Sequence, residues 1–98
     1  MTETKLVSEA RVATPLARRY MTQLCKHFEH KLPVTYTTHT GRIEFQAGLC
    51  LMEAQDETLV LRAEAGDAEG LDRLENVVVK HLERFAFRDK PAVNWVRA

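Results

Sequence analysis

Histidines next to arginines and lysines occur in two short segments of this sequence. One is KHFEH, residues 26–30, and the other is KHLERFAFR, residues 80–88. An imidazole transfers protons near neutral pH or binds a metal ion, and a guanidinium pairs with carboxylates and phosphates. Seven side chains in or near these segments are therefore candidates for binding an anionic small molecule: Arg19, Lys26, His27, His30, His81, Arg84 and Arg88.

The first segment closes a stretch with helical periodicity, residues 16–31. When successive residues are placed about 100° apart, the apolar side chains share one face: Ala17, Tyr20, Met21, Leu24 and Phe28. His27 lies at the border of that face. Arg19, Lys26 and His30 lie further round on the same side, so one flank of this helix carries the nitrogen-rich side chains.

A second helical stretch, residues 68–87, has an apolar stripe: Leu71, Leu74, Val78, Leu82 and Phe85. His81 falls within this stripe, and Arg84 and Arg88 lie at its border. Two antiparallel helices on a sheet would turn their nitrogen-rich flanks either toward each other or away from each other. In the facing case the flanks would form a groove that is rich in His and Arg, poor in carboxylates and suited to an anion.

In such a groove, His81 would anchor the ligand, and Arg84 and Arg88 would neutralise its charge. The opposite wall would come from the first helix: Arg19, Lys26, His27 and His30.

Each of these side chains also has a purely structural interpretation. His81 would then be a buried neutral imidazole bonded to the backbone, since buried polar groups generally find partners. Arg84 and Arg88 would be solvated or would pair with carboxylates of the sheet: Glu9, Glu44 or Glu64. His27 and His30 would be exposed residues near a helix C-terminus, where positive charge is favourable.

The sequence predicts neither a metal site nor a catalytic motif. Cys25 lies about 160° from His27 around the helix, and His27 would miss His81 by about 9 Å along the axis if the midpoints of two antiparallel helices were aligned. The single serine, Ser8, lies in a predicted strand, and there is no glycine-rich phosphate loop. We therefore expect no metal and no cofactor and do not predict an enzyme, although His81 as a general acid–base group stays an alternative.

Local patterns also predict the elements that would position these residues. Alternating apolar residues predict strands over the following ranges: 5–14, 34–38, 42–46, 49–54, 58–65 and 92–96. The four middle strands are expected to form two hairpins, with Gly41 able to take a positive φ in the first. Thr14 and Pro15 would begin the first helix, and Asp67 would cap the second.

The resulting order is β-α-β-β-β-β-α-β. This order predicts an α+β fold, a two-layer sandwich in which a mostly antiparallel sheet carries both helices on one face.

Composition indicates one domain, residues 1–98, of a size that can bury a core without metal or disulfide staples. Fourteen basic and 14 acidic residues give zero formal charge, which argues against a general nucleic-acid binder. No apolar run has the length of a signal peptide or a membrane span, so we expect a cytoplasmic protein. Cys25 and Cys50, without a C-x-x-C motif, are expected to be small buried hydrophobes.

Three stretches carry a resemblance to a known family: Ser8–Val12, Lys26–Phe28, and His81-Leu82 followed by Arg84–Arg88. Together they make the chain, over nearly its whole length, resemble domain-of-unknown-function family 2218, a family of small bacterial proteins. The resemblance implies no established activity. It suggests a fold similar to the two-layer α/β topology of the phosphohexomutase C-terminal domain and an association with siderophore-interacting flavin reductases.

Three hypotheses for function follow. The leading one is a cytoplasmic binding or accessory domain that holds an anionic small molecule, in an iron- or siderophore-related setting. The second is a protein-interaction module that meets a partner reductase or forms a homodimer, through the same flanks or an exposed FAF at 85–87. The third is a small enzyme that uses His81 in proton transfer.

Overall fold

The computed structural model describes residues 5–97, which form six strands and two helices. The elements follow the predicted order: β1 Leu6–Ala13, α1 Ala17–Phe28, β2 Val34–Tyr36, β3 Thr40–Phe45, β4 Gly48–Ala54, β5 Thr58–Ala65, α2 Ala68–Phe85 and β6 Val96–Arg97. Both helices end earlier than periodicity alone predicted, and β6 is shorter than predicted and begins later.

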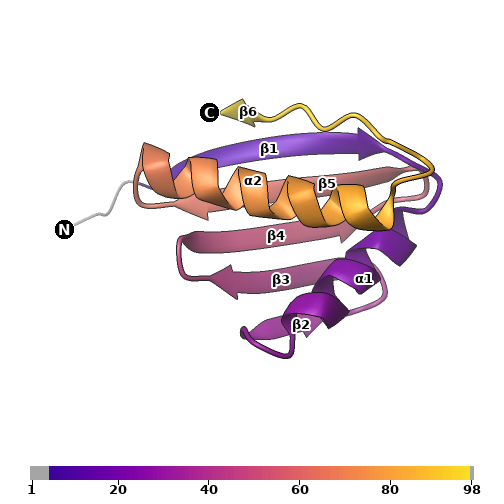
Figure 1. Cartoon of the computed structure of the whole chain (residues 1–98), viewed down its shortest axis with the longest axis horizontal. Coiled ribbons are helices and arrows are strands. Elements are labelled where there is room, and N and C mark those ends of the chain that lie inside the picture. The colour runs from indigo at the N-terminus through magenta and orange to yellow at the C-terminus, as the bar shows by residue number, and fades with distance from the viewer. Residues whose placement is uncertain (1–4, 98) are drawn as a thin grey trace.

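The strands form one antiparallel sheet in the order β2-β3-β4-β5-β1-β6. The two predicted hairpins are joined by a third, tight turn at residues 46–47, so β2 to β5 are a continuous meander. Both helices lie on the same side of the sheet, and within the described residues the opposite face carries no helix (Figure 1). The predicted α+β two-layer sandwich is therefore confirmed.

Strand alternation and helix periodicity explain the core. Every second residue of β1 from Ser8 to Val12 is buried, and the outward residues between them are not. The predicted apolar face of α1 is buried in full, and so are Leu71, Leu74, Val78 and Leu82 of α2. One layer of side chains between helices and sheet thus holds the fold together.

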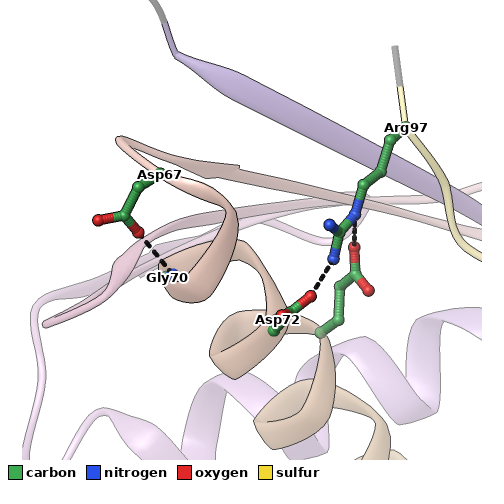
Figure 2. Close-up of polar contacts among 5 residues, drawn as sticks. Asp67, Gly70, Asp72 and Arg97 are labelled. Atoms are coloured by element: carbon green, nitrogen blue, oxygen red, sulfur yellow. Dashed lines mark hydrogen bonds and ion pairs between the residues drawn. The ribbon is translucent and has the colours of Figure 1, made fainter.

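The starts of the two helices differ in how they are capped. Asp67 caps α2 as predicted, because its carboxylate accepts a hydrogen bond of 2.7 Å from the Gly70 amide (Figure 2). The predicted start of α1 was wrong by two residues. The Thr14 hydroxyl accepts from the Leu16 amide at 3.1 Å, and the helix begins only at Ala17, without a side-chain cap.

The expected role of Gly41 was also wrong. Gly41 does not take a positive φ in a turn but lies inside β3, paired with Tyr36 and Met52. A Cβ atom at this position would lie 2.9 Å from the Cys25 sulfur. Close packing of the helix on the sheet is therefore what requires glycine here.

Both cysteines are free and fully buried, as expected. Burial raises the pKa of the Cys25 thiol to about 11 and that of the Cys50 thiol to about 12. Both therefore act as small apolar side chains at neutral pH.

After α2 the chain returns along one edge of the sheet, where β6 pairs with β1 (Figure 1). Trp95 packs against the core, and the guanidinium of Arg97 binds two carboxylates of α2, those of Asp72 and Glu75. Figure 2 shows this double contact between β6 and α2. Neither described helix is long and apolar enough to cross a membrane.

Candidate functional site

The two predicted histidine-bearing flanks meet at one place, between α1 and α2. The ring centroids of His27 and His81 are 4.8 Å apart and the rings are tilted by 46°. The predicted axial gap of about 9 Å was wrong. That expectation aligned the helix midpoints, whereas α1 is displaced toward the C-terminal end of α2, where the Tyr20 hydroxyl reaches Asp89 at 3.2 Å. We call this contact the histidine seam, made of His27 and His81.

His81 is half-buried, and its ring also packs 4.8 Å from that of Phe28. Its Nδ1 lies 2.7 Å from the Val77 carbonyl oxygen. Because a carbonyl only accepts, neutral His81 carries its proton on Nδ1 and donates it to the backbone. The structure thus shows the backbone-bonded arrangement foreseen as the structural alternative, and only Nε2 is left for other partners.

The surroundings of the exposed His27 ring are positively charged. Partial burial lowers the pKa of His27, and His81, Arg84, Lys31 and His30 lower it further. Three of the predicted site residues, His30, His81 and Arg84, thus lie near enough to act on His27.

The predicted carboxylate partners of Arg84 and Arg88 are engaged elsewhere. Glu9, Glu44 and Glu64 pair with arginines of their own strands: Arg11, Arg42 and Arg62. Arg88 lies beyond the end of α2, with its guanidinium 5.5 Å from the ring centre of Phe87. Within the predicted FAF segment, Phe87 is 62% exposed, whereas Ala86 is buried.

Arg19 and Lys26 do not face the histidine seam, so the assumption of one continuous wall was wrong. They line a broad, open hollow of about 780 Å³ bounded by α1, β2 and the turn after β2. We call it the α1–β2 hollow, and its lining residues are Arg18, Arg19, Thr22, Gln23, Lys26, Tyr36, Thr37 and Thr38.

The α1–β2 hollow is lined by three cations and by no carboxylate. Among residues 5–97, Arg18, Arg19 and Lys26 form no ion pair within 4.0 Å. The first turn of α1 contains no acidic residue, so Arg18 and Arg19 add positive charge at the positive end of the helix dipole. The carboxylate of Asp89 reaches this end of the helix, but it accepts from the hydroxyls of Thr14 and Tyr20 and pairs with neither arginine. This is an unfavourable arrangement for the protein alone and a favourable one for a bound anion.

Neutral hydrogen-bonding groups complete the lining of the hollow. The Thr37 hydroxyl is engaged with the Thr40 hydroxyl at 2.8 Å and accepts the Thr40 amide. The hydroxyls of Thr22, Tyr36 and Thr38 make no hydrogen bond within residues 5–97. These are the donors that would complement the three cations around anionic oxygens.

Six lining residues were not among the sequence candidates: Arg18, Thr22, Gln23, Tyr36, Thr37 and Thr38. The pair of arginines in a helix start without acidic residues is a signal that could have identified Arg18. Nothing local could have identified Tyr36 and Thr38, because only the placement of β2 beside α1 brings them to the hollow.

Metal ligands are not gathered at either place. In the part of the chain that the structure describes, no group of three or more His, Cys, Asp or Glu side chains is arranged to hold a metal ion.

Comparison with known proteins gives a matching family and a similar solved structure. No curated protein matches it. The NMR structure of PA4090 from Pseudomonas aeruginosa is similar, with 32% sequence identity, a TM-score of 0.80, and coverage of 93% of this chain and 95% of that one. Residues 9–96 match the family described as an uncharacterized protein conserved in bacteria, and the chain belongs to that family, DUF2218.

Proposed function

We propose that this protein binds a small anion carrying phosphate or several carboxylate groups in the α1–β2 hollow. The observation that carries the proposal is the set of three cations, Arg18, Arg19 and Lys26, which line one hollow without a carboxylate. Clustered like charges repel one another, so a site of this kind gains most from a ligand that brings negative charge.

The residue types favour an oxyanion. A guanidinium presents parallel N–H groups that match two oxygens of a phosphate or carboxylate, and a lysine adds a mobile point charge. The hollow is broad and open, which suits a solvated polyanion better than a compact apolar ligand.

The histidine seam is the weaker of the two candidate places. Its rings pack against each other and against Phe28, and the Nδ1 of His81 is already bound by the backbone. Arg84 would contribute charge there, whereas Arg88 lies against Phe87 beyond the end of α2, so the role of both arginines is tested beside that of the hollow.

If the protein acts in an iron-related setting, the expected ligand is an anionic iron chelate. Such chelates commonly present carboxylate oxygens, which belong to the class that the hollow fits. The support for this setting is the family resemblance, so the test includes an iron chelate beside simple anions.

The test is a titration of the protein with inorganic phosphate, citrate and ferric citrate, followed by NMR chemical-shift changes. The first variant carries Arg19→Gln and Lys26→Gln, and the second carries Arg84→Gln and Arg88→Gln. Removing two charge-assisted contacts should weaken binding by about 10- to 100-fold or more in the first variant. The second variant should bind as the parent does.

Arg73→Gln serves as the control, because Arg73 is an exposed cation that pairs with Glu69 on α2. It should leave each affinity unchanged. Loss of affinity in the Arg84/Arg88 variant alone would move the site to the seam, and equal affinity in all variants would refute both places.

A further inference from the structure

The face of the sheet opposite the helices is covered by no helix or strand of residues 5–97 (Figure 1). Outward-pointing residues of β1, β3, β4 and β5 form this open face, because side chains alternate along each strand. Its charged members are three arginines and four glutamates: Arg11, Arg42, Arg62, Glu9, Glu44, Glu53 and Glu64.

Apolar side chains lie among these charges on the open face. Val7, Leu49, Leu51 and Val60 are only partly buried there. Val96 of β6 pairs with Glu9, so it points to the same face, and it is 71% exposed. A face with five apolar side chains, one of them largely exposed, has apolar surface to cover.

We propose that the open face is covered by a second copy of this chain. The signs of its charges are nearly balanced and interspersed, so the face offers no excess of positive charge to a nucleic acid or an acidic lipid surface. A second copy carries the same mixture of charges and can match each sign with its opposite.

The strand register shows how the copies would match. Arg42, Leu51, Arg62 and Glu9 form one row across four neighbouring strands, β3, β4, β5 and β1. A two-fold axis that runs parallel to the strands, between β4 and β5, exchanges the ends of this row. It places Arg42 of each copy opposite Glu9 of the other, so the symmetric contact contains this pair twice.

The size of the face is adequate for such a dimer. Six strands about 4.8 Å apart, with a rise of about 3.4 Å per residue, give a flat area of roughly 550 Å². Side-chain relief increases the accessible area above this value, toward the roughly 800 Å² per partner of a standard stable interface.

The test is analytical ultracentrifugation of the whole chain from micromolar to millimolar concentration. The parent should sediment as a dimer at the upper end. Arg42→Glu or Glu9→Arg alone should raise the dimer Kd by about tenfold or more, since each places two like-charged pairs in the contact. The combined Arg42→Glu, Glu9→Arg variant should restore the parent Kd to within about threefold.

Two further variants distinguish loss of the dimer contact from damage to the fold by a charge reversal. Val96→Asp changes a largely exposed side chain and should also weaken the dimer. Arg73→Glu combined with Glu69→Arg reverses an exposed pair on α2, on the other side of the sheet, and should have no effect. A parent chain that stays monomeric at every concentration, or a dimer that ignores Arg42, Glu9 and Val96, would overturn the proposal.

Discussion

A methyl group added to Gly41 would overlap two core side chains. Its carbon would lie 2.9 Å from the Cys25 sulfur and 3.0 Å from the Met52 methyl carbon. Overpacking of this kind in a buried layer costs about 1–3 kcal/mol, so Gly41→Ala should lower the free energy of unfolding by that amount. Urea unfolding followed by circular dichroism would measure the change.

Gly66→Ala is the matched control for this prediction, because a Cβ at Gly66 meets no atom within 4 Å. It should leave stability nearly unchanged. Adding Cys25→Ala to Gly41→Ala should recover part of the loss, since the closest overlapping atom is then gone. A Gly41→Ala protein as stable as the parent would show that α1 does not pack closely on β3.

Single residues differed in how well the sequence predicted their surroundings. The apolar faces of both helices and the cap at Asp67 were predicted, because each depends on neighbours within a few positions. The packing of Gly41 against Cys25 was not, because it joins residues from two elements whose contact no local pattern encodes.

At the scale of elements, the sequence predicted that one flank of α1 carries the nitrogen-rich side chains. It did not predict that these side chains face two different neighbours. His27 faces α2, whereas Arg19 and Lys26 line the hollow toward β2. A helix on a sheet has neighbours on both sides, and residues on one flank can face either neighbour. Which element lies where depends on the strand order, and the sequence pattern left that order undetermined.

The contact between β6 and α2 leads to a prediction about the C-terminal end of the chain. Arg97 is the cation that binds Asp72 and Glu75 at once, and Trp95 packs into the core two residues before it. Arg97→Ala should release β6 and expose Trp95, while the midpoint of global unfolding changes little, because exposed ion pairs contribute little to stability. Acrylamide quenching of the single tryptophan would measure the exposure.

Two further variants serve as controls for the quenching experiment. Arg97→Lys keeps the charge but not the planar fork, so its quenching should lie between those of the parent and Arg97→Ala. Arg73→Ala removes an ion pair that lies within α2 and should leave quenching unchanged. Equal quenching in parent and Arg97→Ala would show that Trp95 is held by its own packing alone.

At the scale of the whole molecule, the net charge is zero, but paired and unpaired charges lie on different parts of the surface. Arginines on the open face pair with glutamates two positions away, whereas the cations of the α1–β2 hollow and those around the histidine seam lack such partners among the described residues. Composition could predict the balance but not this separation, because the fold decides which charges become neighbours. The separation has a consequence for stability in mild acid.

The histidine seam should make the fold less stable as the pH falls below neutrality. Partial burial, with His81, Arg84, Lys31 and His30 nearby, lowers the pKa of His27 from its usual 6.5. The unfolded chain therefore binds more protons than the folded chain at pH values between the lowered pKa and 6.5, so stability decreases as the pH falls through that window. Above it, His27 is neutral in both states and has no such effect.

The measurement is the thermal unfolding midpoint of the parent and of His27→Gln between about pH 7.5 and about pH 5. Carboxylates and other histidines contribute to both curves, so the prediction concerns the difference: the parent midpoint should fall more steeply than that of His27→Gln. His39→Gln removes an exposed histidine from the turn after β2 and should keep the steep parental slope. Parallel curves for parent and His27→Gln would mean that protonation of His27 does not oppose the packing of α1 on α2.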